Sequence, residues 1–510
     1  MSGDRHLRPD PEGRLGGRPP RPASVRVTAD PDHAGTVAGQ HLLAMLVHLL
    51  ARQFEIVETI SNDIESTPAR AEVFRAPRIG AGELTEALIE LGRRVGASSI
   101  VTTAGGASSP PTVRIHLGAG WDPTSESIPA LAVAVDGWVL SARSTAAIAG
   151  PVPRSSNPFA AQLAACVAAG FAFKSAFERQ TPVDVALDLW PEPDPPEPSA
   201  VSLPPAYVLG LGAVGAAFGY ALSSAPGLRG VLMGIDPQTM SDTDRNRLVS
   251  GTADDRGEPK AALFMRLFGQ PEFTVGTFAG KWPRDYIGDA AREVPAALRA
   301  DEDDGRFRWI ISCVDRDTDR ADIAARLPRH VLSGSTYGMA AQIISYSLDG
   351  PCECLACRHR RVRPVSVEQT YAHLRSLTVG EREAWYDERG ANPSERAAIE
   401  TYLGAGDPSC ATPGAADLVR LGVQGAVDWA VGFVSVAAGV LLAVRFIRAA
   451  VLGERREIER GSEWRLFFWR DELDIHRARR ASDCPICSGP QQDAWRALWD
   501  LAQSDQSRDE

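Results

Sequence analysis

The sequence contains no apolar run that we expect to cross a membrane. Its most apolar stretch, from Trp429 to Val444, is bounded by Asp428 and Arg445 and is shorter than the roughly 20 residues that a spanning helix needs. The start of the chain also lacks the apolar core of a signal peptide, and its arginines, prolines and glycines predict a disordered arm over residues 1–24. We therefore expect a cytoplasmic protein with no membrane partner, in which the apolar stretch forms a buried core helix.

An excess of basic residues is also missing. The chain has 54 Lys and Arg against 65 Asp and Glu, so its formal net charge of -11 argues against nucleic acid as a partner.

Cysteines are few, 8 in 510 residues, yet four of them fall into two C-x-x-C pairs, CLAC and CPIC. Such pairs favour metal binding in a reducing cytoplasm over the disulfides of a secreted protein.

The 510 residues are too many for one ordinary core, so we expect two main domains. The clearest boundary is a Pro-rich segment at residues 182–206, which contains PEPDPP and predicts an extended interdomain linker. It separates an α/β domain at 25–181 from a second domain at 207–492, and residues 493–510 form a tail. Within the second domain, the polar and helix-rich stretch at 358–415 is typical of a crossover insertion.

Strand-like and helix-like stretches alternate in both domains. The second domain opens with AYVLGLGAVGAAFGYALSS, which predicts a strand, a glycine turn and a helix, followed by the strand GVLMGID. Alternation of this kind predicts an α/β fold, with a Rossmann-like, mostly parallel sheet covered by helices on both faces. The same alternation predicts a second α/β unit in the first domain, which we expect to be a degenerate Rossmann-like domain. Its sequence holds neither a glycine fingerprint nor a C-x-x-C pair, so we expect no catalytic equipment in it.

The glycine turn has the spacing of a dinucleotide-binding fingerprint, with Gly210, Gly212 and Gly215 in GLGAVG. In that motif the first glycine permits a tight turn, the second lets phosphate approach the backbone, and the third lets the helix pack on the strand. Asp236 ends the next strand, 21 residues after Gly215, where a carboxylate can hold ribose hydroxyls. We expect a nucleotide here, and a purely structural glycine turn is the alternative.

NAD or FAD is the usual ligand of such a turn, but the residues further along point away from redox chemistry. From Asp236 the chain reads DPQTMSDTDRNRLVSGTADDRGEPKAA, which resembles the ThiF, MoeB and ubiquitin-activating superfamily. Arg247 and Lys260 stand 13 residues apart, the spacing of that superfamily's basic pair. The resemblance implies ATP as the cofactor, with both cations neutralising its triphosphate during adenylyl transfer. The alternative is a solvated arginine and lysine in a polar loop.

The resemblance continues in ISCVDRDTDR, which is similar to the superfamily's Asp-x-x-Asp-Asn followed by an arginine. It implies that Asp315 binds Mg²⁺ at the end of a strand and that Arg320 begins the next helix. Two residues depart from the pattern, because Ser312 replaces the first aspartate and Asp244 replaces an asparagine. Asp244 and the neighbouring Asn246 are therefore both candidates for polar contact with the nucleotide.

The two C-x-x-C pairs hold Cys354, Cys357, Cys484 and Cys487, and 127 residues separate the pairs. Each pair can place two thiolates on one ion, and together they complete a tetrahedral site closed to substrate, which favours structural Zn²⁺. The wide separation also matches the superfamily. A redox dithiol is the alternative, and Cys352 is a spare residue that either replaces a ligand or is inert.

A cysteine between the two pairs is the candidate for covalent chemistry. Cys410, in DPSCATPG, is similar to the superfamily cysteine that attacks the acyl adenylate and carries the product as a thioester or persulfide. No histidine lies nearby in sequence to act as its base, and a plain surface cysteine is the alternative. Core packing is the expected role of Cys313 and Cys166.

The first domain carries its own resemblance, in SSNPFAAQLAACVAAGFAFKSAF with Asn157, Pro158 and Phe159. This segment is similar to a helix that ends an inactive adenylation domain in the same superfamily. Because simple members work as symmetric dimers, a fused inactive copy implies an internal pseudo-dimer, and a true dimer stays open. An unrelated domain that recruits substrate is the alternative.

The leading functional hypothesis is adenylation of the C-terminal glycine of a ubiquitin-like or sulfur-carrier protein, with release of pyrophosphate and transfer to Cys410. A conjugating enzyme is then a further partner. The second hypothesis is adenylation of a small peptide matured as a natural product, for which Cys410 is dispensable. The third is a non-catalytic scaffold with a decayed nucleotide site, suggested by Ser312 and Asp244.

Overall fold

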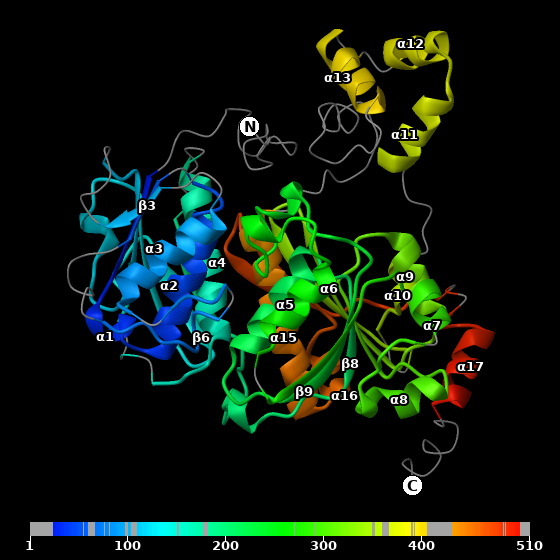
Figure 1. The fold of residues 1–510 in the computed structure, drawn as a ribbon, viewed down its shortest axis with the longest axis horizontal. Coiled ribbons are helices and arrows are strands. Elements are labelled where there is room, and N and C mark those ends of the chain that lie inside the picture. The colour runs from blue at the N-terminus through cyan, green and yellow to red at the C-terminus, as the bar shows by residue number, and fades with distance from the viewer. Residues whose placement is uncertain are drawn as a thin grey trace. The chain divides into compact units, whose positions relative to one another are not determined.

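The computed structural model describes most of the chain in two compact units (Figure 1). One unit comprises Met1–Pro20 and Arg361–Val431, and the other comprises Arg21–Arg360 and Gly432–Glu510. The described residues are 24–54, 56–59, 67–75, 77–80, 82–96, 100–103, 110–149, 152, 154–176, 182–269, 271–289, 291–348, 352–359, 367–388, 391, 393–404, 431–482, 484 and 486–499.

The larger unit begins with a seven-stranded sheet in the order β3-β2-β1-β4-β5-β6-β7. The first five strands of that order run parallel, and β6 and β7 are antiparallel to their neighbours. The strands are β1 (Ser24–Ala29), β2 (Ile56–Thr59), β3 (Ile100–Thr103), β4 (Val113–Leu117), β5 (Ala130–Asp136), β6 (Val139–Arg143) and β7 (Asp184–Asp188). The helices are α1 (Pro31–Ala34), α2 (Val37–Leu50), α3 (Leu84–Val95) and α4 (Phe159–Ala176), with 3-10 turns η3 (Pro123–Ser125) and η4 (Pro198–Ala200).

A second sheet of eight strands follows in the order β10-β9-β8-β11-β12-β13-β14-β15, parallel up to β12 and antiparallel beyond it. Its strands are β8 (Ala206–Leu209), β9 (Gly230–Ile235), β10 (Phe273–Phe278), β11 (Trp309–Ser312), β12 (His330–Tyr337), β13 (Ala340–Tyr346), β14 (Glu463–Phe467) and β15 (Glu472–His476). Its helices and 3-10 turns are α5 (Ala213–Ser224), η5 (Asp242–Asp244), η6 (Ala253–Asp255), α6 (Lys260–Leu267), α7 (Arg284–Gly288), α8 (Ala296–Asp303), α9 (Asp317–Ala324), α10 (Leu355–His359), α15 (Gly432–Leu452), α16 (Glu454–Arg460) and α17 (Pro490–Leu498).

The two sheets repeat one plan, which confirms the predicted α/β fold class. In each, the first strand is third from one edge, the next two strands extend from it to that edge, and the following strands extend to the other edge. Helices cover both faces of the second sheet (Figure 1). In such sheets, ligands bind beyond the carboxyl ends of the strands where the order reverses, which is between β8 and β11 here.

Two apolar helices form the centre of the larger unit. By length and composition α4 and α15 could cross a membrane, but 94% and 89% of their most apolar windows are buried inside the protein. Helix α15 packs against both α5 and α4, and so joins the domains built on the two sheets. The sequence prediction of a core helix in this stretch is confirmed for the described residues, which begin at Val431.

The segment predicted as a linker, residues 182–206, lies within the folded larger unit. Its first part forms β7, an edge strand paired with β6, because the stretch Asp184–Asp188 contains no proline to interrupt the ladder. The Pro-rich part that follows is packed onto the protein: both guanidinium Nη atoms of Arg448 lie 2.7 Å from the carboxylate of Glu192. The ring of Trp190 lies 5.2 Å from that of Trp138. This segment is therefore part of the folded core of the larger unit.

The smaller unit is helical. Its described helices are α11 (Val367–Ser376), α12 (Val379–Glu388) and α13 (Pro393–Gly404), and they share a small apolar core of Leu374, Tyr386, Ala391, Ile399, Tyr402 and Leu403. The predicted insertion at 358–415 begins too early, because residue 358 belongs to α10 of the larger unit. Cys410 lies outside the described residues.

Candidate functional site

In the glycine turn between β8 and α5, packing explains why two positions are glycine but gives no steric reason for Gly212. Gly210 has a φ of +84°, and a Cβ on Gly215 would lie 2.0 Å from the carbonyl oxygen of Gly210, so both positions require glycine. Around Gly212, the N-cap of α5, a Cβ would meet no described atom within 4 Å. Open space at the N-terminus of a 12-residue helix is suited to a phosphate group.

Asp236 lies directly beside this turn, one residue beyond β9. Its carboxylate accepts hydrogen bonds from the backbone N–H groups of Leu211 (2.6 Å) and Gln238 (2.7 Å). Burial raises the pKa of Asp236, opposed by these two hydrogen bonds and by the charge of Lys260. A carboxylate has about four lone-pair positions, so Asp236 can still accept two hydroxyl groups such as those of a ribose.

The predicted cations converge on Asp244. Lys260 is the first residue of α6, and its Nζ lies 2.9 Å from Gln238 Oε1 and 3.3 Å from Asp244 Oδ1. Arg247 Nη2 lies 3.5 Å from the same Asp244 oxygen. Burial acts to raise the pKa of Asp244, but Lys260, hydrogen bonds from Ser241 and then Arg247 lower it below its usual value. Asp244 is therefore an ionised partner that orients both cations.

Asn246 occupies the same turn and directly precedes Arg247. Its side-chain Oδ1 is buried without a described hydrogen-bond partner. Gln238 is the site residue that sequence reasoning missed. Its only sequence signal is a position two residues after Asp236, and its role as a Lys260 partner needs the folded loop.

Asp315 lies three residues beyond β11, which pairs with β8 through Ser312 and Leu209. Its side chain is exposed, while its backbone carbonyl accepts a hydrogen bond from Arg320 Nη1 at 3.2 Å. Arg320 also contacts Asp317 Oδ1 at 3.1 Å, so it holds this turn. Ser312 is fully buried, and its hydroxyl has no hydrogen-bond partner among the described residues. Asp315 remains as the exposed carboxylate suited to a hydrated Mg²⁺.

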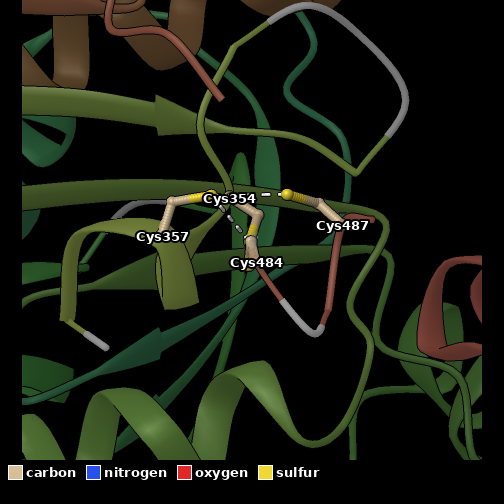
Figure 2. Close-up of side chains that lie close together, drawn as sticks. All are labelled: Cys354, Cys357, Cys484 and Cys487. Carbon is tan, nitrogen blue, oxygen red and sulfur yellow. Dashed lines mark hydrogen bonds between the residues drawn. The ribbon is translucent and has the colours of Figure 1, made fainter. Parts of the chain in front are cut away.

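The four paired cysteines meet in one buried cluster. Figure 2 shows their side chains pointing toward one another, with Sγ distances of 3.7 Å for Cys354–Cys357 and Cys354–Cys484 and 3.3 Å for Cys357–Cys487. All four sulfurs lie within 4.8 Å of one another. In a tetrahedral Zn²⁺ site with Zn–S bonds of about 2.3 Å, the sulfurs are roughly 3.8 Å apart, so the donor set fits zinc.

The surroundings of the cluster are those of a structural site. Trp495 and Trp499 of the C-terminal segment cover it, and their indole N–H groups donate to the carbonyls of Pro328 and Leu327. A hydrogen bond from the Cys354 thiol lowers the pKa of Cys357 to about 4, which favours a thiolate. Cys352 is buried but lies outside the group of four.

The remaining described cysteines are poor nucleophiles. Burial raises the pKa of Cys313 to about 12 and raises the pKa of Cys166 well above its usual value. Both thiols therefore stay protonated near neutral pH. Cys313 instead packs its backbone against Gly210, where a Cβ would lie 2.9 Å from the Cys313 carbonyl.

Glu463 of β14 bonds Arg358 of α10, the helix that contains Cys357. This contact predicts that the stability of the protein depends on pH. Burial alone would raise the pKa of Glu463, but Arg358, followed by Arg465 and Gln342, lowers it to about 2. Because the folded-state pKa lies below the usual 4.5, this stabilisation is complete above about pH 4.5 and is lost as pH falls toward 2. We expect Glu463→Gln to lower the free energy of unfolding by about 2–3 kcal/mol at pH 7.

Thermal unfolding of wild type and Glu463→Gln across pH 2.5–7 measures this effect. The difference between the two melting temperatures should shrink as the pH falls. Loss of zinc in acid would lower both melting temperatures, so it would not by itself remove the difference. The exposed Glu472→Gln is the matched control and should track the wild type. A difference that stays constant with pH would contradict the assignment.

Comparisons with known proteins give a partial match. Residues 24–185 match the family described as the BilD N-terminal domain. The uncharacterized protein y4jF of Sinorhizobium fredii (strain NBRC 101917 / NGR234) is 24% identical over 357 residues, which are 66% of this chain and 60% of the relative. The chain thus matches less than two thirds of that relative's length.

Among solved structures, the fold is similar to E. coli MccB. The MccB structure with ATP has a TM-score of 0.33 and 14% identity, covering 57% of this chain and 68% of MccB. The microcin C7 biosynthetic enzyme MccB in complex with N-formylated MccA has a TM-score of 0.34, with the same identity and the same coverage of both chains.

Proposed function

We propose that this chain uses ATP to adenylate the C-terminal carboxylate of a polypeptide. One observation supports this above the others: three neighbouring strands, β9, β8 and β11, end in Asp236, the open glycine turn and Asp315. From β9 to β8 to β11, these positions would supply a ribose acceptor, a phosphate site and a magnesium ligand. They lie at the point where the strand order reverses. Lys260 adds a cation beside Asp236.

In the proposed reaction a carboxylate oxygen attacks the α-phosphorus of ATP. The bond between that phosphorus and the bridging oxygen breaks, and pyrophosphate leaves with the electron pair. Lys260 and Arg247 would stabilise the negative charge on the triphosphate oxygens, with Asp244 holding them in place. Mg²⁺ on Asp315 would supply further charge neutralisation. Zn²⁺ on the four cysteines would have a structural role only.

The primary substrate candidate is a ubiquitin-like or sulfur-carrier protein that ends in glycine, followed by transfer to Cys410 and onward to a conjugating enzyme. The second is a small peptide precursor of a natural product, which needs adenylation alone. It needs no nucleophilic cysteine, and the described cysteines outside the metal cluster are buried or half-buried.

Exchange of labelled pyrophosphate into ATP tests the proposal. We expect exchange with a substrate that has a free C-terminal carboxylate and none with the same substrate amidated. Exchange with glycine-terminated carrier proteins alone selects the first candidate, and exchange with short peptides alone selects the second. ATP binding without exchange for any substrate would instead favour the scaffold. For the thioester, mass spectrometry should detect a reducible adduct that is lost in Cys410→Ala.

A further inference from the structure

One side chain of the first domain contacts the backbone of the proposed nucleotide site. Arg52 follows the C-terminus of α2 and is only 8% exposed. Its Nη1 donates to the carbonyl of Arg245, and its Nη2 donates to the carbonyl of Gly251 at 2.8 Å. A single guanidinium therefore bridges two backbone positions six residues apart in the second domain.

The segment between these carbonyls carries Asn246 and Arg247. Leu248 and Val249 anchor it in the core, each at 1% exposure. On another side α15 begins against it, since a Cβ on Gly432 would lie 2.8 Å from the Asn246 carbonyl oxygen. The backbone at Arg247 is thus fixed in two ways: Leu248 and Val249 are buried in the core of the second domain, and Arg52 of the first domain binds the carbonyls at both ends of the segment.

The chemistry of Arg52 is unusual for a group with only a packing role. It is a buried cation that forms no ion pair with any described residue, and burial, with the nearby charge of Arg245, lowers its pKa to about 9. The planar fork of a guanidinium can donate to two carbonyls at once, whereas a lysine ammonium is a single point of charge. Position and chemistry therefore both favour a bridging role.

We propose that Arg52 is a positioning residue, through which the first domain holds the 245–251 segment so that Arg247 faces the triphosphate. The proposal rests on the proposed adenylation function. It gives a domain without a glycine fingerprint a defined part in nucleotide binding at its neighbour. Misplacement of a binding group by about 1 Å can cost roughly 100-fold in activity, so the expected effect is measurable.

The test compares Arg52→Met and Arg52→Lys with wild type in the full chain. Hydrogen exchange, followed by mass spectrometry without nucleotide, should be faster in residues 244–252 of both variants and unchanged in α8. ATP affinity, measured by calorimetry, should fall about 10- to 100-fold in both. Arg143→Met is the matched control, because Arg143 is an exposed first-domain arginine paired with Asp184, and it should match wild type in both measurements.

Hydrogen exchange tests the positioning role of Arg52, and ATP affinity also tests the proposed nucleotide site. Wild-type exchange and wild-type ATP affinity in Arg52→Met would overturn the positioning role. A wild-type result for Arg52→Lys would also overturn it, because charge alone would then suffice. Exchange that rises across the whole second domain would reveal a general loss of stability in place of local positioning. If wild type binds no ATP, the nucleotide site itself is wrong, while faster exchange in residues 244–252 still reports the bridge.

Discussion

Cys484→Ser should abolish zinc binding and lower the melting temperature by roughly 5 °C. The cluster joins the segment at Cys354 and Cys357 to the distant segment at Cys484 and Cys487, and the two tryptophans of the C-terminal segment pack on it. Structural zinc contributes about 10–16 kcal/mol in isolated peptides, and we expect at least about 4 kcal/mol here because the surrounding core persists.

Metal analysis and calorimetric unfolding of the purified protein measure both effects. Wild type should carry one zinc per chain, and treatment with a chelator should reproduce the variant's lower melting temperature. Cys352→Ser is the matched control, since Cys352 is also buried and lies outside the cluster. A Cys484→Ser protein with full zinc content and wild-type stability would exclude the four-cysteine site.

Asp315→Ala should reduce magnesium-dependent pyrophosphate exchange by roughly 100- to 1000-fold, the usual loss for one group that stabilises transition-state charge. The side chain is exposed, and the turn is held by Arg320 through the backbone carbonyl, which the substitution leaves in place. Stability should therefore stay within about 0.5 kcal/mol of wild type, so that the loss reports on chemistry.

Exchange rates measured over a range of Mg²⁺ concentrations give the comparison. Asp254→Ala removes another exposed carboxylate from the second domain and should retain wild-type exchange. If Asp315→Ala kept its exchange rate within a few-fold, the magnesium site would have to lie elsewhere. If Asp254→Ala lost as much exchange activity, the cause would be the overall negative charge of the domain and not a single magnesium ligand.

The fold and part of the site follow from local sequence. Gly215 has a steric reason that a spacing pattern captures, because its nearest contact, the carbonyl oxygen of Gly210, lies within the same turn, whereas Gly210 itself packs against the distant backbone of Cys313. The four cysteines were predictable for a different reason: each pair is a local motif, and metal chemistry requires the two pairs to meet. The convergence of Lys260 and Asp244 was less predictable, because it depends on the path of the whole loop between β9 and α6.

Other features have no local signal. Arg52 bridges positions 193 and 199 residues further along the chain, so neither periodicity nor motif indicates it. The start of the predicted linker became β7, because pairing with β6 outweighs the Pro-rich composition that follows. The role of Cys410 stays a prediction, since that residue lies outside the described part of the chain.

The packing of α4 on α15 has a consequence for how the protein responds to dilution. Both helices belong to one polypeptide, and α4 is held to the second sheet as well, because Lys174 Nζ lies 2.5 Å from Oδ2 of Asp471 in the turn between β14 and β15. Formation of the contact between α4 and α15 is therefore unimolecular, with an effective concentration that stays in the millimolar range however few molecules a cell contains. An adenylating site braced in this way would keep the same specific activity at nanomolar and micromolar protein.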